Sequence, residues 1–295
     1  MEVAHGIHRI ESDLGVRFMC QYALAGPERT LLVDTGLAGT PERVILPYLE
    51  RAGLEPDLVV ISHADLDHCG GDRVLRARYP RALFACHEAD RRWIESNEAM
   101  LRENYLWHEP YGFHEPDEAA RRVMLADLGG DAPIDLGLRG GETVRLGPDW
   151  RVEILHLPGH TLGHLAVWDP RSRAAIIVDA VLCDGICDRE GNKLIPPRYY
   201  DAEAYRATIR RLRALEPDLL LTAHYPVLDA AEARTWLDRA LVFTDELDNV
   251  VREAIREGTT DLWELTKRAN ERLGPFPEFM TELGAAVRAH AGLEH

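Results

Sequence analysis

Four side chains able to bind a metal ion lie within six consecutive positions of the sequence: His63, Asp65, Asp67 and His68. They follow the apolar residues 58–61, which predict a buried strand. A strand that ends in imidazole and carboxylate groups presents them at a sheet edge, where α/β proteins place their sites. These two ligand types together suit zinc, iron or manganese, and a second ion is feasible where the ligands suffice. The segment therefore predicts a metal centre.

The same residues also have a purely structural interpretation. Asp and His are frequent in turns at strand ends, and Asp67 would cap the helix that follows, which we expect to begin at Gly70 and Gly71. For any one of these residues taken alone, a structural role and a metal-binding role explain its presence equally well. Four such residues together, with no other polar function between them, favour the metal site.

Three later apolar runs also predict strands that are followed by a ligand type. Residues 152–157 lead to His160, residues 174–178 to Asp179, and residues 219–223 to His224. An acid or imidazole that ends an apolar strand loses hydration unless it is paired or bound to metal, so packing does not explain this recurrence. We therefore expect the three residues to complete the centre. His164, four residues after His160, is open between a supporting partner of a ligand and a packing residue.

At these positions the chain resembles the metallo-β-lactamase superfamily. The first motif of that family, His-x-His-x-Asp-His, corresponds to residues 63–68, which read His-Ala-Asp-Leu-Asp-His. Its later ligands correspond to His160, in the stretch Pro-Gly-His-Thr-Leu-Gly-His, and to Asp179 and His224. Residues 34–36 resemble the family's Asp-Thr-Gly turn, which supports the metal ligands from behind. The resemblance covers residues 1 to about 230 and implies an α/β fold, the four-layer αββα sandwich.

The resemblance also implies how the ligands divide between two divalent ions. One ion would be held by His63, Asp65 and His160. The other would be held by Asp67, His68 and His224, with Asp179 as a bridge between the two. Two neighbouring ions lower the pKa of a shared water, and the resulting metal-bound hydroxide attacks a carbonyl carbon. The implied activity is hydrolysis of a small ester, thioester or lactone, with Asp67 as the catalytic residue that orients the nucleophile.

One ligand position departs from the family pattern, because Asp65 stands where the second histidine of the first motif is expected. A carboxylate is a harder ligand than imidazole and favours iron or manganese over zinc, so the metal is open between these. An acidic residue there resembles the flavodiiron branch, which carries Glu. Two alternatives follow from this change: a non-haem iron protein with redox or oxygen-handling activity, and a metal-binding protein with little catalysis. No flavodoxin-like domain is visible, which favours the hydrolase.

The composition argues against several classes of protein. A net charge of −16, from 34 basic and 50 acidic side chains, disfavours nucleic acid as a partner, since phosphate binding needs a basic face. No apolar stretch reaches the roughly 18 residues of a membrane-spanning helix. No leader pattern is visible, and the five cysteines are scattered, which predicts reduced thiols in a cytoplasmic protein. We expect a small-molecule substrate as partner, and a homodimer is open.

The pattern of elements predicts a metallo-β-lactamase-like catalytic domain over residues 1–229, followed by a C-terminal helical region over residues 230–292. Helices are expected at 230–257 and 262–273, with a last helix after the break at 274–277. Such a region resembles the glyoxalase II-like branch of the family, in which it helps to form the substrate pocket. Residues 293–295 read as the remnant of an expression tag.

An insertion at residues 88–135 separates the first motif from the strand that leads to His160. Its pattern is largely helical, and it is rich in aromatic residues, among them Trp93, Tyr105, Trp107 and Tyr111. Three interpretations are open: a cap over the pocket, a small core of the insertion itself, or a dimer contact.

Overall fold

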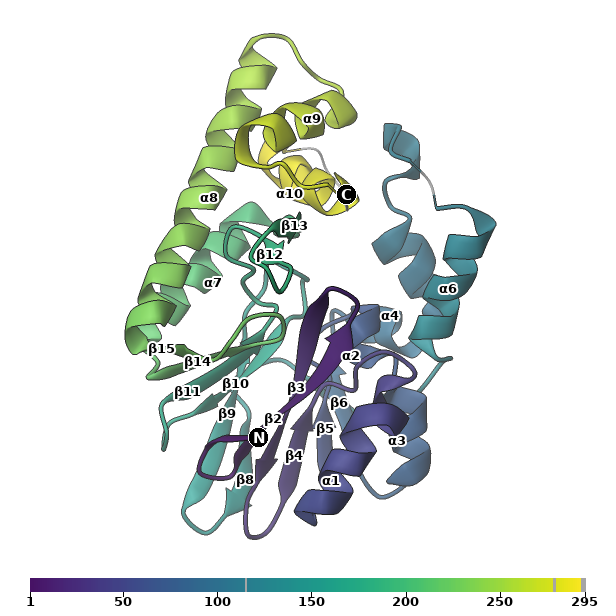
Figure 1. Ribbon diagram of the computed structural model, residues 1–295, viewed down its shortest axis with the longest axis vertical. Coiled ribbons are helices and arrows are strands. Elements are labelled where there is room, and N and C mark those ends of the chain that lie inside the picture. Colours follow the sequence, from purple (N-terminus) through teal and green to yellow (C-terminus); the bar gives the residue numbers. More distant parts are fainter. Residues whose placement is uncertain (115, 278–279, 293–295) are drawn as a thin grey trace.

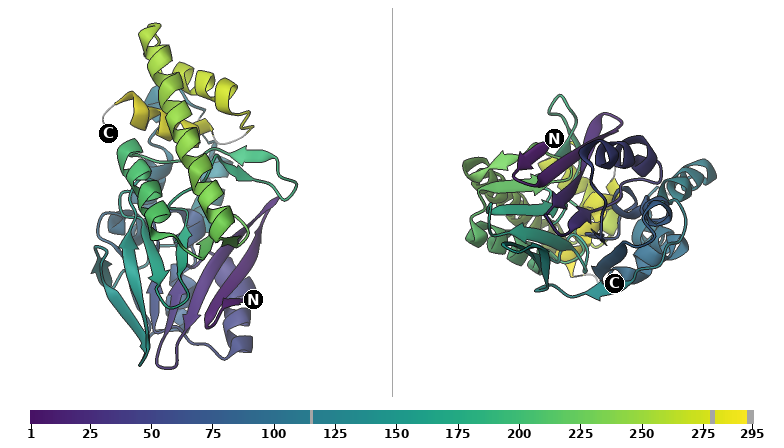
Figure 2. Two further views of the ribbon diagram at one scale, coloured as in Figure 1. Left: turned by 90° about the vertical axis from the view of Figure 1, so that its left-hand side faces the viewer. Right: turned by 90° about the horizontal axis from the view of Figure 1, so that it is seen from below.

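Two large β-sheets lie face to face, with helices on both outer sides (Figure 1). The structure is a computed structural model, and it describes residues 1–114, 116–277 and 280–292. Seen from below, the layers follow the order helix, sheet, sheet, helix (Figure 2). This αββα arrangement confirms the predicted fold class. The predicted tag remnant at 293–295 lies outside the described residues.

The first sheet contains the strand that leads into the first motif. In spatial order its strands are β1 (Glu2–Ala4), β2 (Ile7–Leu14), β3 (Arg17–Ala25), β4 (Thr30–Val33), β5 (Leu58–Val60), β6 (Leu83–His87) and β7 (Leu136–Leu138). The strands from β1 to β4 pair antiparallel, and those from β4 to β7 pair parallel. Because β4 and β5 are parallel, their carboxyl ends meet at one edge. The turn at residues 34–36 and the motif at 63–68 therefore lie side by side.

The second sheet positions the later candidate ligands. In spatial order its strands are β15 (Leu228–Asp229), β14 (Leu219–Thr222), β11 (Ala174–Val178), β10 (Leu165–Asp169), β9 (Trp150–His156) and β8 (Thr143–Gly147). Only the pair of β11 with β14 is parallel within this sheet as described. The carboxyl ends of these two strands therefore point the same way, which brings Asp179 and His224 to one edge.

Apolar side chains between the two sheets hold them together. Val33 and Val60 from the first sheet share a buried cluster with Ile176 and Leu221 from the second. Burying each such side chain contributes about 1.5–3 kcal/mol, so this layer is a main source of stability. A second cluster joins the outer face of the first sheet to α1 (Leu46–Ala52) and α3 (Asp72–Arg78).

The first motif turns helical earlier than the sequence predicts. Helix α2 (Leu66–Cys69) follows Asp65 directly, so the prediction of a helix start at Gly70 and Gly71 was wrong. The two glycines instead allow a close approach of backbones. A Cβ on Gly70 would lie 2.2 Å from the carbonyl oxygen of Asp127, and one on Gly71 would lie 2.4 Å from that of Thr35. A larger residue at position 71 would therefore push the motif away from the Asp-Thr-Gly turn, and one at position 70 would push it away from Asp127.

Helices cover the outer face of the second sheet and extend beyond it (Figures 1 and 2). The helices on this face are α7 (Ala202–Leu215) and α8 (Ala230–Arg256), and α9 (Leu262–Leu273) and α10 (Met280–Ala291) lie beyond the end of the sheet. Asp229 begins α8 with a capping box to Glu232, and Asp261 caps α9, which confirms the predicted helices. One buried cluster runs from the sheet to α10. The division at residue 229 stays a prediction.

The insertion folds as several short helices beside the first sheet. They include α4 (Arg91–Glu95), α5 (Asn97–Ala99) and α6 (Glu118–Leu128), with a π-helical turn at Met100–Tyr105. A small hairpin of β12 (Ile186–Cys187) and β13 (Lys193–Ile195) lies between the sandwich and the C-terminal helices (Figure 1). None of the described helices is long and apolar enough to cross a membrane.

Candidate metal centre

The seven predicted ligands converge where the two sheets present the carboxyl ends of their parallel strands. Their ligand atoms form three overlapping groups, each within 4.8 Å: His63 with Asp65 and His160, His63 with His68 and Asp179, and Asp67 with His68 and His224. Residues separated by more than 150 positions thus share one cluster. The role of each residue as a ligand stays a prediction, but the distances between their ligand atoms can be compared with those expected around a metal ion.

The position formed by Asp67, His68, Asp179 and His224 has the spacing of a metal site. Asp179 Oδ2 lies 3.2 Å from Nε2 of both His68 and His224. Asp67 Oδ2 lies 3.6 Å from His224 Nε2. Ligand atoms bound at about 2 Å to one tetrahedral ion lie roughly 3 Å apart, so these separations fit. Buried His68 Nε2 and Asp179 Oδ1 make no hydrogen bond within the described residues, which leaves both atoms free to bind an ion.

The charges around this position favour a cation. Burial lowers the pKa of His68, but the carboxylates of Asp34 and Asp179 outweigh it and raise that pKa well above its ordinary value. Burial likewise raises the pKa of Asp179, but His224 and His68 hold it well below the usual range. The cluster therefore stabilises positive charge, and a divalent ion held by these residues would supply that charge in place of the imidazole proton.

Neighbouring groups fix which ring nitrogen each histidine presents. Asp34, in the left-handed region at φ 67°, lies 2.8 Å from His68 Nδ1 and accepts from the amide and hydroxyl of Ser62. The carbonyl oxygen of Phe18 lies 3.0 Å from His224 Nδ1. Because each Nδ1 donates to an acceptor, Nε2 remains as the metal-binding atom. The contact of Asp34 with His68 is the one that the resemblance implies for the Asp-Thr-Gly turn, whereas the role of His68 as a ligand stays a prediction.

The position predicted at His63, Asp65 and His160 has similar distances between its ligand atoms, but its carboxylate also contacts an arginine. Asp65 Oδ2 lies 3.2 Å from His63 Nε2 and 3.1 Å from His160 Nε2. The same oxygen accepts a hydrogen bond from the guanidinium of Arg198. Burial raises the pKa of Asp65, but the charge of Arg198 outweighs it and holds the pKa well below the usual range. Sequence reasoning missed Arg198, which lies in an irregular loop without a periodic signal.

His164 packs against the centre. Its ring stacks on His63 with 4.6 Å between centroids, and neither ring nitrogen has a hydrogen-bond partner in the residues described. Burial holds the pKa of His164 well below its ordinary value, so the ring is neutral. Of the two interpretations open for His164, the structure favours the packing residue.

A cavity of about 260 Å³ opens onto the candidate ligands. Its apolar wall is formed by Leu14, Leu37, Leu66, Leu182, Ile186, Ile195 and Pro196. Its polar wall contains Arg17, Tyr105, Asp127, Arg198 and Glu282. Glu282 lies on α10, so the C-terminal helical region contributes to this pocket.

Of the four aromatic residues of the insertion for which a cap was one of the open interpretations, only Tyr105 lines this cavity. Trp93 packs against the core of the first sheet and donates its indole N–H to Glu103. Trp107 and Tyr111 pack against the cluster that includes the C-terminal helices. The aromatic side chains therefore serve mainly as packing between the insertion and the rest of the chain.

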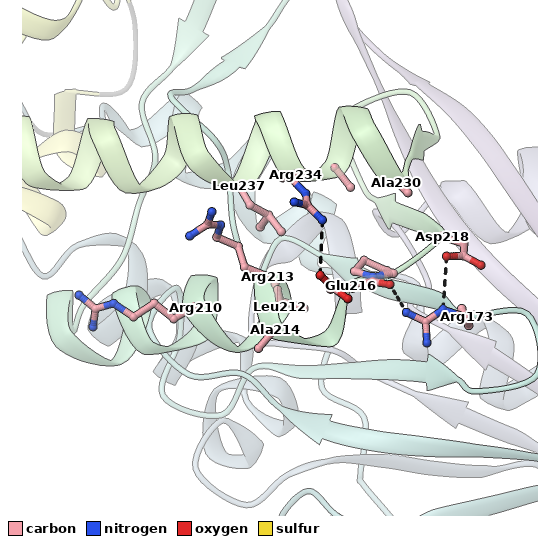
Figure 3. Close-up of a pocket in the computed structure, with 12 residues that line it drawn as sticks. Arg173, Arg210, Leu212, Arg213, Ala214, Glu216, Asp218, Ala230, Arg234 and Leu237 are labelled. Carbon is pink, nitrogen blue, oxygen red and sulfur yellow. Dashed lines mark hydrogen bonds and ion pairs between the residues drawn. The ribbon is translucent and has the colours of Figure 1, made fainter.

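A larger cavity of about 540 Å³ lies between α7 and α8, away from the ligands (Figure 3). Four arginines line it, but Arg173 is paired with Asp218 and Arg234 with Glu216, and no histidine takes part. A third arginine, Arg213, is paired with Asp238 outside the wall. The smaller cavity therefore remains the candidate site for chemistry.

Comparison with known proteins places the chain in a family. Residues 19–224 match the model of the metallo-beta-lactamase superfamily. The hydroxyacylglutathione hydrolase GloC of Haemophilus influenzae is 25% identical over 205 residues, which cover 69% of this chain and 83% of that protein. A hydroxyacylglutathione hydrolase of Cereibacter sphaeroides is 27% identical over 203 residues, which cover 67% of this chain and 57% of that protein. The match thus spans little more than half the length of the second relative.

Solved structures show the same fold. A metallo-beta-lactamase family protein from Thermus thermophilus superimposes with a TM-score of 0.73 at 20% identity, over 98% of this chain and 93% of that one. A beta-lactamase domain protein from Burkholderia ambifaria gives 0.74 at 17% identity, over 99% and 86%. The family model covers every predicted ligand from His63 to His224. The chain therefore belongs to the metallo-beta-lactamase superfamily and is one of its metal-dependent hydrolases.

Proposed function

We propose that this hydrolase cleaves a small ester, thioester or lactone at the cavity beside its metal centre. The observation that carries the proposal is the cluster of Asp67, His68, Asp179 and His224. All but His68 line the cavity, and two buried ligand atoms, His68 Nε2 and Asp179 Oδ1, have no hydrogen-bond partner among the described residues. A divalent ion held there would act as a Lewis acid and make a water nucleophilic near neutral pH.

The remaining residues of the site would position the reactants. The carboxylate of Asp67 is partly exposed to the cavity, so it can accept a hydrogen bond from a water and orient it toward a carbonyl carbon. Arg17 lies 3.9 Å from Asp67 Oδ2 and 3.3 Å from His224 Nδ1, and lines the same cavity. Its guanidinium would hold a polar or anionic part of the substrate beside the reacting bond.

The shape of the cavity supports a small acyl substrate. Its volume suits a compact molecule, and its apolar wall would hold the acyl chain. The names of the relatives refer to hydroxyacylglutathione, which makes a thioester the first class to test. The described cysteines are all free, which supports a reducing compartment such as the cytoplasm as the site of action.

The identity and number of the ions are open to measurement. Two imidazoles and two carboxylates suit zinc, manganese or iron alike. An iron protein with redox or oxygen-handling activity is the second candidate, and Asp65, as a hard oxygen ligand, is the observation that favours it. Metal analysis of protein purified without added metal tests this second candidate, because protein that holds zinc and no iron cannot carry out iron-based redox chemistry.

Hydrolysis should be measured on chromogenic esters, thioesters, lactones and β-lactams, with and without chelation. We expect hydrolysis of at least one acyl class, loss on chelation and recovery on adding zinc or manganese. His224→Ala should lower kcat/KM at least about a hundredfold, because it removes a ligand. Asp218→Asn is the matched control, since Asp218 is exposed at the opposite end of β14 and should change nothing. Activity that survives both chelation and His224→Ala would refute the proposal.

A further inference from the structure

The atom that would bind an ion at the first position already has a cationic partner. Arg198, only 4% exposed, donates a guanidinium hydrogen bond to Asp65 Oδ2. That oxygen is the one that faces Nε2 of His63 and His160. Since an arginine does not lose its proton in a protein, this positive charge is permanent. An ion bound at the same oxygen would lie beside it and be repelled.

The surroundings hold this pair in place. Asp65 Oδ1 accepts from the Tyr105 hydroxyl at 3.1 Å and from Asn104 Nδ2 at 3.3 Å. The Arg198 guanidinium lies 5.8 Å and 5.7 Å from the ring centroids of Tyr105 and Tyr200. Moving Arg198 aside would therefore break aromatic contacts and leave a buried carboxylate without its counter-charge.

The balance of charge points the same way. Asp65, Asp67 and Asp179 are the carboxylates among the candidate ligands. Only Asp65 among them belongs to the first position, where His63 and His160 add no negative charge, and the guanidinium of Arg198 already balances it. A divalent ion bound there would bring two further positive charges into a buried site, where charges are poorly screened.

We propose that the centre binds one divalent ion, at Asp67, His68, Asp179 and His224, and that the guanidinium of Arg198 takes the place of the second ion by neutralising Asp65. This inference rests on the metal site of the proposed function but not on its substrate. It also accounts for the departure from the family motif. A neutral histidine at position 65 would have no attraction for Arg198, whereas an aspartate forms an ion pair with it.

Metal stoichiometry measured by equilibrium dialysis tests the inference directly. Wild-type protein equilibrated with zinc, or separately with manganese, should bind one ion per chain. Arg198→Gln removes the charge and keeps most of the side-chain volume, so a second ion should bind, at least about tenfold more tightly than to the wild type. Arg198→Lys keeps a cation and should stay at one ion. Arg189→Gln is the control, because Arg189 pairs with Asp13 on the surface, and it should also stay at one.

The outcomes separate this inference from the proposed function. Two ions bound by the wild type, or one ion still bound by Arg198→Gln, would overturn it. If Arg198→Gln does not fold, the variant Asp65→His/Arg198→Gln restores the family motif without a buried charge and should bind two ions. A wild type that binds one ion but hydrolyses nothing supports the inference and contradicts the proposed substrate class. A wild type that binds two ions and hydrolyses an ester contradicts the inference and supports the proposed substrate class.

Discussion

Single hydrogen bonds behind the centre decide whether its histidines can bind an ion. Asp34 is the main example, since its two oxygens accept from Ser62 and from His68 Nδ1. The carboxylate fixes the tautomer of His68 and increases the basicity of its Nε2. An aspartate also tolerates the left-handed backbone at this turn better than most residues.

Asp34→Asn should therefore weaken metal binding about 10–100-fold while the fold is kept. Asparagine fits the same backbone conformation and shape, but it lacks the negative charge that holds the His68 proton. Competition with a chromogenic chelator measures the affinity. Wild-type affinity in this variant would show that Asp34 has only a structural role.

The pairing of Asp65 with Arg198 leads to a second prediction at this scale. Asp65→Ala should lower the free energy of unfolding by about 3–5 kcal/mol, because it leaves a buried guanidinium without its partner. Its metal content should stay at that of the wild type. Urea unfolding of Asp65→Ala and of Asp65→Ala/Arg198→Met checks the cause, since the double variant should recover part of the loss. Loss of one bound ion in Asp65→Ala would instead make Asp65 a metal ligand.

At the scale of elements, α10 connects the pocket to the C-terminal helices. Glu282 near its start lines the cavity, and His290 near its end lies between the Tyr199 hydroxyl at 2.8 Å and Asp248 at 3.1 Å. The imidazole side chain is fully buried there. Burial lowers the pKa of His290 from 6.5 to about 4. The docking of α10 therefore depends on a neutral histidine.

The sign of the resulting pH dependence follows from the two pKa values of His290. Below pH 6.5 the unfolded chain binds a proton that the folded protein binds only below about 4. The contribution of His290 is complete above pH 6.5 and is lost as the pH falls toward 4. Its full size is about 3 kcal/mol. Between pH 7 and 4, the wild type should therefore lose about 3 kcal/mol more stability than His290→Gln. Equal losses in urea titrations of the two proteins would refute this assignment.

At the scale of the molecule, an ion bound at the proposed site would connect the two sheets. Asp67 and His68 follow a strand of the first sheet, and Asp179 and His224 follow strands of the second. An unfolded chain does not hold these four groups together, so the ion binds the folded state preferentially.

Metal removal should therefore destabilise the whole protein. At a free ion concentration one hundred times the dissociation constant, binding adds about 2.7 kcal/mol to the free energy of unfolding. Thermal unfolding with zinc or with a chelator should show a clear shift in Tm for the wild type and little shift for His224→Ala. Equal shifts in both proteins would mean that zinc acts elsewhere.

The sequence by itself determined the strands that carry the site and the residue types at their ends. The apolar runs 174–178 and 219–223 correspond to β11 (Ala174–Val178) and β14 (Leu219–Thr222), and the ligand types after them lie at one edge. These signals are local, because a buried strand needs consecutive apolar residues and an imidazole or acid at its end needs a partner. Helix α9 was equally readable, since its cap residue and its terminal Gly-Pro stand in the sequence.

Only the tertiary structure decided the partner of Asp65 and the walls of the pocket. Arg198 lies 133 positions from Asp65, in an irregular loop, and no local pattern links the two. Glu282 lines the cavity because α10 packs beside it. Most of the aromatic residues of the insertion pack against buried clusters and do not line the cavity. Such contacts depend on the directions in which side chains leave distant elements, which periodicity along the chain does not encode. The ligand types were therefore readable from the sequence, whereas the charge that surrounds them required the fold.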